Sequence, residues 1–127
     1  MDKRKIHLDW YGYCKYNLDN IDKYVPEKAG VYKIGVLQKS SGKLKVHYVG
    51  QTINLNKRLK EHLDFKNEEN ECLVKHLRKY YCKFKFARVS LQNNRDGAER
   101  ALCFHYTPEC NDPDIIPDGP DIDINND

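Results

Sequence analysis

The chain has 127 residues, of which 39% are hydrophobic and 32% are charged, and its formal net charge is +3. This length and balance predict one globular domain with a hydrophobic core and little room for a second module. No run approaches the roughly 18 apolar residues of a membrane span, and no apolar signal segment follows the basic start. The composition therefore excludes a membrane protein and predicts a cytoplasmic one, or a nuclear one in a eukaryote.

The charge is unevenly distributed along the chain. Residues 108–127 contain seven acidic residues and no Lys or Arg, which leaves 22 basic and 12 acidic residues before them, a surplus of about +10. Such a surplus favours a polyanionic partner through electrostatic steering and counterion release. Ordinary solubility charge would give the same composition, so charge alone does not identify a nucleic-acid-binding protein.

Residues 1–24 combine a basic start with a cluster of aromatic side chains. Aromatic residues interleaved with lysines can form a base-stacking platform for single-stranded nucleic acid. The alternative is an N-terminal flap packed over the edge of a sheet, and we favour this second interpretation. The aromatic residues are Trp10, Tyr11, Tyr13, Tyr16 and Tyr24.

The next segments predict a β-hairpin followed by a helix. Residues 30–37 and 44–49 are rich in β-branched and aromatic side chains, and the polar, glycine-containing segment between them is typical of a turn. A helix capped by Thr52 or Asn54 is expected to continue to about residue 65, with leucines at every fourth position. Arg58 and His62 lie one turn apart beside these leucines, so we expect both to point toward the hairpin.

The remaining chain predicts a helix over 71–81, a half-buried third strand over 83–90 and a third helix over 97–106. Residues 113–127 carry three of the five prolines without helical or strand periodicity, and we expect an acidic tail that is disordered or loosely attached. The predicted fold is a small α/β (α+β) domain over residues 25–112, with a three-stranded, mainly antiparallel sheet flanked by three helices.

Several of these residues together resemble a known motif. Gly30-Val31-Tyr32, Tyr48-Val49-Gly50 and Arg58 followed by His62 are similar to the motif of the GIY-YIG endonucleases. Glu99 and Asn111 match the later glutamate and asparagine of that family in order and relative position. The resemblance covers roughly residues 25–112, and it departs from the usual pattern in its longer hairpin turn.

The resemblance implies a metal-dependent endonuclease that hydrolyses DNA phosphodiester bonds to 5′-phosphate and 3′-hydroxyl ends. Glu99 would hold one divalent ion, Mg²⁺ or Mn²⁺, and Arg58 would stabilise charge on the phosphate. Tyr32 or Tyr48 would accept the proton of the attacking water. We favour Tyr32 as this base, with Tyr48 and His62 positioning it. The implied catalytic residues are Tyr32, Tyr48, Arg58, His62, Glu99 and Asn111.

Simpler explanations exist for each residue taken alone. Asp96 and Glu99 fit a capping box at a helix start, although Glu99 also falls on the inward arc of the predicted helix, where a carboxylate is costly unless it is paired or binds a cation. Tyrosines are common in strands. A non-catalytic nucleic-acid-binding module with the same fold is therefore the alternative function.

We expect the DNA to contact basic and polar side chains around this site. Position 51 is glutamine where some family members have a lysine. The resemblance leaves the substrate open, because repair, restriction and mobile-element nucleases all use this domain. Specificity in the family usually comes from attached domains or insertions, and a partner protein or a homodimer is a further way to supply it here. The expected DNA-binding residues are Lys33, Gln51, Lys57, Lys75, Arg78 and Lys79.

The five cysteines, an odd number without secretory context, favour reduced thiols over a disulfide framework. The patterns Cys72-x3-His76-x5-Cys82 and Cys103-x-His105 with Cys110 contain zinc-ligand residue types but lack the paired Cys-x2-Cys of common structural sites. Buried free thiols are the favoured interpretation, and a zinc-stabilised interaction domain is a third possible class of function.

Overall fold

The computed structural model describes residues 4–125. Residues 1–3 and 126–127 lie outside the described part, and with them Lys3 of the basic start and Asp127 of the predicted acidic tail. The described chain alternates strands and helices, and none of its helices is long and apolar enough to cross a membrane. In chain order the elements are β1 (Arg4–Ile6), β2 (Tyr11–Lys15), α1 (Leu18–Tyr24), β3 (Gly30–Leu37), β4 (Leu44–Thr52), α2 (Leu55–His62), α3 (Glu71–Lys79), β5 (Cys82–Arg88), α4 (Gln92–Tyr106), the 3-10 helix η1 (Pro113–Ile115) and β6 (Ile122–Ile124).

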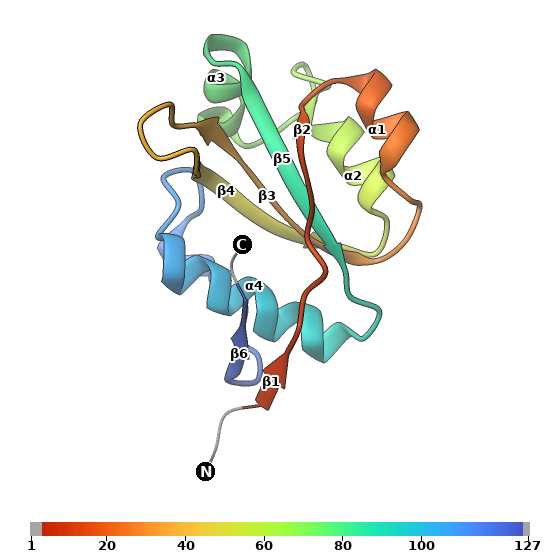
Figure 1. Ribbon diagram of the computed structural model, residues 1–127, viewed down its shortest axis with the longest axis vertical. Helices are drawn as coiled ribbons and strands as arrows, with labels where there is room; N and C mark the ends of the chain where they lie inside the picture. Colours follow the sequence, from red (N-terminus) through yellow and green to blue (C-terminus); the bar gives the residue numbers. More distant parts are fainter. Residues whose placement is uncertain (1–3, 126–127) are drawn as a thin grey trace.

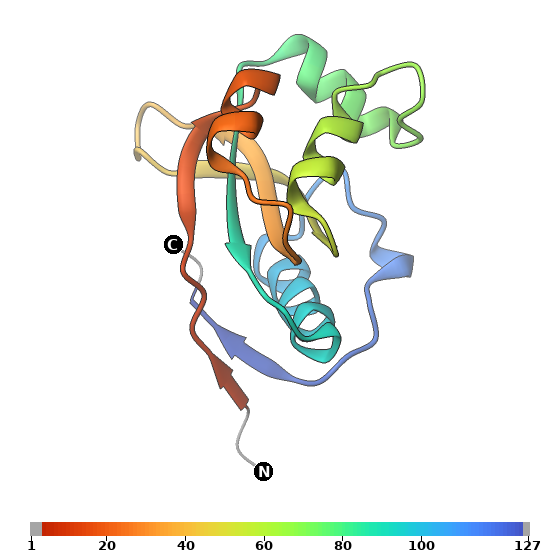
Figure 2. The ribbon, with the colours of Figure 1, turned by 90° about the vertical axis from the view of Figure 1, so that its right-hand side faces the viewer.

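A four-stranded sheet in the order β2-β5-β3-β4 forms the centre of the molecule, and all three of its strand pairs are antiparallel. Helices α1, α2 and α3 lie on one side of this sheet, and α4 crosses the other side (Figures 1 and 2). The predicted α+β class with an antiparallel sheet is confirmed. The central sheet has one strand more than expected and the fold has one α-helix more, because β2 and α1 form within the predicted N-terminal flap. The strands β1 and β6 of the small second sheet were also not expected.

The sheet separates two hydrophobic cores because successive strand residues point to opposite faces. In β3, Val31 faces the core under α4, while Tyr32 and Ile34 face the core under α1, α2 and α3. Strand β5 is central, so both of its faces are covered. The prediction of a half-buried third strand is therefore wrong: even Lys85 is buried, with its ammonium 4.3 Å from the centre of the Tyr13 ring.

The hairpin of β3 and β4 contains a β-bulge. Ile34 lies opposite Tyr48, but Gly35 lies opposite Val46, so His47 is an extra residue without a partner in β3. Tyr32 lies opposite Gly50, where an added Cβ would collide with the hydroxyl and ring of that tyrosine. Position 50 therefore requires glycine, because the Tyr32 side chain packs directly against its Cα. The register also places Tyr32 and Tyr48 on the same face of the sheet.

The two ends of the chain pack against each other. β1 and β6 form a parallel two-stranded sheet beside α4 (Figure 1). The Asn125 side chain accepts a hydrogen bond from the Leu8 amide and donates one to the Leu8 carbonyl. Ile122 is buried and lies against Gly97 of α4. Residues 113–125, expected to be disordered or loosely attached, instead form a strand and help to position α4.

Candidate active site

Helix α2 carries two of the predicted site residues. Its N-terminus is capped by Asn54, whose side-chain oxygen accepts a hydrogen bond from the Lys57 amide at 3.0 Å. Leu55 and Leu59 are fully buried against the sheet, as the periodicity predicted. The helix ends at residue 62, about three residues before the predicted end, and its packing directs the side chain of His62 into the protein.

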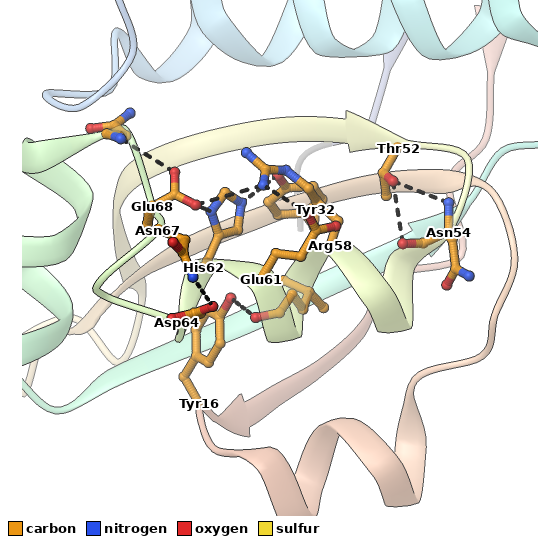
Figure 3. A network of polar contacts seen from close by, with 12 residues as sticks. Tyr16, Tyr32, Thr52, Asn54, Arg58, Glu61, His62, Asp64, Asn67 and Glu68 are labelled. Carbon is orange, nitrogen blue, oxygen red and sulfur yellow. Dashed lines mark hydrogen bonds and ion pairs between the residues drawn. The ribbon is translucent and has the colours of Figure 1, made fainter.

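A buried chain of hydrogen bonds links the hairpin to the segment after α2 (Figure 3). The Tyr32 hydroxyl lies 2.7 Å from His62 Nε2, and His62 Nδ1 lies 3.0 Å from a carboxylate oxygen of Glu68. Because the carboxylate can only accept, Nδ1 carries the proton and Nε2 accepts from the tyrosine. The exposed side-chain fractions of His62 and Glu68 are 0% and 5%. This Tyr32–His62–Glu68 chain is closed off from solvent.

Burial changes the acid–base properties of this chain. The pKa of Tyr32 is raised well above its ordinary value, first by burial and second by the neighbouring Tyr48, so the phenol is protonated at neutral pH. The pKa of His62 is lowered to about 4, because burial and the Arg58 charge outweigh the opposing effect of Glu68. A neutral imidazole with a free lone pair on Nε2 is therefore available to receive a proton from Tyr32.

Arg58 lies at the edge of this chain and remains partly exposed. Its Nη1 is 3.6 Å from a Glu68 oxygen and 3.9 Å from a Glu61 oxygen (Figure 3). Burial raises the pKa of Tyr48, and the Arg58 charge works in the opposite direction. The guanidinium is thus oriented by two carboxylates while one-third of the side chain stays open to a ligand.

Helix α4 supplies a carboxylate from the other face of the sheet. The side-chain amide of Gln51 donates to Glu99 at 3.0 Å and to Asp96 at 2.7 Å. Burial raises the pKa of Glu99, the Gln51 hydrogen bond lowers it, and the Asp96 charge raises it again. Because α4 begins at Gln92 without a side-chain cap, Asp96 is inside the helix and the capping-box explanation for Glu99 is wrong.

A groove of about 550 Å³ runs along the edge of β4, where the two faces of the sheet meet. Tyr48, Glu99 and Asn111 all line it. The Asn111 side chain accepts from the Val49 amide and donates to the Val49 carbonyl, both at 2.9 Å, and so fixes the backbone beside Tyr48. Tyr32 does not line the groove: it is only 1% exposed and lies behind Gly50.

The family model described as the GIY-YIG catalytic domain matches residues 28–100, more than half of the chain. The chain belongs to the GIY-YIG family. The matched region contains the hairpin, the Arg58 helix and Glu99, whereas Asn111 lies outside it. No curated protein sequence matches the chain significantly.

Solved structures share the GIY-YIG fold with this chain. The magnesium-bound N-terminal GIY-YIG endonuclease domain of UvrC from Thermotoga maritima is 23% identical over 74% of this chain and 98% of its own, with a TM-score of 0.56. An asparagine-to-alanine mutant of that domain, bound to its catalytic divalent cation, is 21% identical over 74% and 97%, with a TM-score of 0.57. These likenesses show a common fold for the larger part of the chain.

The donor chemistry around Glu99 fits a hard divalent cation. A half-buried carboxylate in a polar groove offers an oxygen ligand, and the volume of the groove leaves room for several bound waters, as Mg²⁺ requires. Gln51, the residue that replaces the lysine of some family members, donates to this carboxylate and adds no charge. A cation bound to Glu99 would also relieve the repulsion between Glu99 and Asp96.

The predicted DNA-binding residues fall into three groups. Lys33 is buried: it is 2% exposed, it donates to the Tyr106 hydroxyl at 2.9 Å, and it lies 4.3 Å from the Trp10 ring centre. Its assignment as a DNA contact is wrong, because β3 is a central strand covered on both faces. Gln51 contacts the two acids described above. Four side chains are exposed as expected: Lys57, Lys75, Arg78 and Lys79.

The cysteines are only partly as predicted. Cys14, Cys82 and Cys103 are buried free thiols, but Cys72 and Cys110 form a disulfide with a Cα–Cα distance of 5.3 Å. The expectation that all five thiols are reduced is therefore wrong for this pair. The pairing joins residues 38 positions apart, on α3 and on the loop after α4, and no local pattern in the sequence indicates such a contact.

Two acids of the site were missed from the sequence. Glu68 lies between the two helices predicted to end at about residue 65 and to begin at residue 71, where no site residue was expected, and Asp96 was considered only as a helix cap. The burial of Glu68 depends on α3 turning back toward α2, which periodicity does not reveal. A signal for Asp96 was present, because its spacing of three from Glu99 puts both on the same side of a helix.

Proposed function

We propose that this GIY-YIG protein is a divalent-metal-dependent endonuclease that hydrolyses DNA to 5′-phosphate and 3′-hydroxyl ends. One observation carries the proposal: a single groove is lined by the carboxylate of Glu99 and by Tyr48, whose ring centre lies 6.2 Å from that of Tyr32, the hydrogen-bond partner of the buried His62. A binding module would need the groove and the basic surface, but it would have no use for a buried proton acceptor.

Glu99 is the residue that would hold the metal, Mg²⁺ or Mn²⁺. When bound there, the metal neutralises negative charge on the scissile phosphate and on the leaving oxygen. Gln51 keeps the Glu99 carboxylate oriented toward the groove, and its hydrogen bond favours the ionised form that a metal needs. Asn111 holds the β4 backbone, and hence Tyr48, at the same groove.

The proton of the attacking water passes to Tyr48. This differs from the initial preference for Tyr32, and burial supports the change: Tyr48 lines the groove, whereas water does not reach Tyr32. Since the pKa of Tyr48 is raised by burial, the phenolate is scarce, and a phenol that accepts a proton must pass its own onward. Tyr32, whose ring centre lies 6.2 Å from that of Tyr48, is the next hydroxyl on the way to His62.

The path ends at His62. Tyr32 donates to the imidazole Nε2, and Glu68 stabilises the imidazolium that forms when the proton arrives. The low pKa of His62 keeps the imidazole neutral near neutral pH, and Glu68 offsets part of the cost that burial and Arg58 impose on the imidazolium. Arg58 remains at the mouth of this network, where its guanidinium contacts the phosphate oxygens as negative charge develops.

The exposed basic side chains bind the phosphate backbone of the DNA. Lys57 lies on α2, and Lys75, Arg78 and Lys79 lie on α3, so all four belong to helices on the same side of the sheet as Arg58. Each contact of this kind with the phosphate backbone releases counterions and makes binding sensitive to salt. Replacing these side chains should weaken DNA binding without altering the cleavage chemistry.

The test is cleavage of duplex, branched and single-stranded DNA by the purified chain with Mg²⁺, alongside Glu99→Gln. The change removes one charge at nearly constant shape, so cleavage should fall by about 10³-fold or more while DNA affinity is retained. DNA binding by both proteins without cleavage of any substrate would instead support the non-catalytic module. Cleavage at equal rates by both would remove Glu99 from the metal site.

A further inference from the structure

A second group of metal-ligand residues lies where β4, α3 and the loop after α4 meet. One ligand atom each of Cys72, His76 and Cys110 lies within 4.8 Å of the other two, and the same holds for His47, His76 and Glu109. Cys72, Cys110 and Glu109 also border the groove, but Glu99 belongs to neither group. The nuclease proposal assigns no role to these residues.

Three separate features of the fold bring this group together. Cys72 and His76 are one helical turn apart on α3 and therefore share a face. His47 is the bulge residue of β4, and its carbonyl accepts a hydrogen bond from the Cys110 amide at 2.8 Å. A bulge re-aims a side chain that regular pairing would direct elsewhere. Here it stacks the His47 ring on that of His76, with centroids 4.1 Å apart.

The hydrogen bonds of His76 leave one ring nitrogen prepared for a metal. Its Nε2 lies 3.1 Å from a Glu109 oxygen, so Nε2 carries the proton and Nδ1 is a bare lone pair. Among the described residues this Nδ1 has no hydrogen-bond partner, although it is buried. Metal-ligating histidines commonly donate their other N–H to a carboxylate in this way. A buried lone pair without a partner is costly unless something binds it, and a ring nitrogen of His76 lies within 4.8 Å of both sulfurs.

We propose that, with its thiols reduced, the chain binds one zinc ion through Cys72 Sγ, Cys110 Sγ and His76 Nδ1, with a water in the fourth position. Two thiolates and one imidazole suit zinc, and Glu109 holds the imidazole in the required tautomer. A dithiol reductant breaks the disulfide, giving two electrons and two protons and becoming a cyclic disulfide itself. Zinc then displaces the two thiol protons into solvent.

Either state ties the loop after α4 to α3. The Cys110 carbonyl accepts from the side chain of Asn70, which also caps α3, and the next residue is Asn111, which holds the β4 backbone at the groove. The cross-link therefore supports the position of Tyr48 whether it is a disulfide or a zinc ion. The zinc form gives the chain this support where disulfides are kept reduced.

Zinc binding is tested by metal content and native mass spectrometry after reduction, removal of metal by a chelator and titration with zinc chloride. The reduced chain should bind about one zinc per molecule, and the oxidised chain should bind none. Cys72→Ser, Cys110→Ser and His76→Asn should each weaken binding at least about 100-fold, and Glu109→Gln by about 10-fold. Cobalt in place of zinc should show thiolate-to-metal absorption in the reduced chain.

The matched controls lie outside the group. Cys103→Ser removes a buried free thiol, His105→Asn removes an exposed histidine, and Glu99→Gln removes the proposed magnesium ligand, so all three should retain the zinc. The comparison of the reduced with the oxidised wild-type chain needs no substitution and is independent of any folding defect. Failure of the reduced wild type to bind zinc, or undiminished binding by both cysteine variants, would overturn the proposal, whether or not the protein cleaves DNA.

Discussion

The two sides of the groove are built in different ways. On the α2 side, Tyr32, His62 and Glu68 form a closed chain in which each hydrogen-bonding group has a partner within the protein. On the α4 side, Glu99 and Asp96 share the neutral amide of Gln51, and within residues 4–125 no basic side chain forms an ion pair with either. On the α2 side the hydrogen-bonding groups are satisfied within the protein, whereas on the α4 side the two carboxylates leave negative charge that a bound cation can balance.

This difference suits the α2 side to proton transfer and the α4 side to cation binding. A closed, desolvated chain holds its donors and acceptors in one arrangement and excludes competing water, which suits the movement of a proton. Glu99 presents a carboxylate to the groove and is oriented by the Gln51 amide, which suits a cation. The chemistry is therefore divided along β4, whose Tyr48 is the only one of the two motif tyrosines to reach the groove.

The largest expected effect on the cleavage rate comes from replacing Tyr48, the tyrosine at the groove end of the α2 side. Tyr48→Phe deletes the hydroxyl that contacts water and should lower the single-turnover rate at saturating Mg²⁺ by about 10²- to 10⁴-fold. Tyr32→Phe interrupts the next step and should cost less, roughly 10-fold, because Tyr48 still positions the water. Tyr81→Phe alters an exposed tyrosine and should have no effect. A larger loss for Tyr32→Phe would make Tyr32 the base, as the sequence first suggested.

The position of α4, which carries Glu99 and Asp96, depends on packing against the C-terminal strand β6. Ile122 is 3% exposed and lies against Gly97, two residues before Glu99 on α4. Ile122→Ala should lower the free energy of unfolding by about 2 to 4 kcal/mol, measured by urea denaturation. Ile115→Ala, at a highly exposed position of the same segment, is the matched control and should be nearly neutral. Equal stability of the two variants would show that the segment does not support α4.

The α2 side should also give the protein a pH-dependent stability. His62 has a folded-state pKa of about 4 against an ordinary value of 6.5, so between these values the unfolded chain binds a proton that the folded chain does not. The free energy of unfolding should therefore fall by the order of a few kcal/mol as the pH drops from about 6.5 to 4. His62→Gln should flatten this dependence, whereas replacement of the exposed His105 should not. Part of the slope will remain, because burial also lowers the pKa of His47.

The sequence predicted the hairpin and α2 well, because their signals are local. Strand composition, an Asn54 cap and leucines at every fourth position depend only on nearby residues, and together with the motif spacing they identified Tyr48, Arg58 and His62 as neighbours. The same reasoning failed for Lys33, since a lysine in a strand was taken to be exposed. Its burial follows from Trp10 and Tyr106, which contact its ammonium and come from distant parts of the chain.

The remaining errors have the same origin. Glu68 is buried because α3 folds back on α2, and the disulfide forms because the loop after α4 reaches α3. The C-terminal segment has no periodicity, yet it is ordered because β1 offers an edge to β6. Local patterns thus predicted what each element is, whereas the environment of a charged side chain depended on which elements meet.

The smallest expected effect comes from Gln51, the link within the α4 side. Gln51→Ala removes the hydrogen bond that lowers the pKa of Glu99, so the carboxyl should hold its proton to a higher pH and bind Mg²⁺ about 10-fold more weakly, with little change in the rate at saturating Mg²⁺. Gln92→Ala is the matched control: Gln92 donates to Asp96 and to Gln51 but makes no recorded bond to Glu99. The Mg²⁺ concentration needed for half-maximal cleavage, measured at several pH values, separates the two variants. If both shift it equally, the amide acts through Asp96 or through packing, and the orientation of Glu99 does not depend on Gln51.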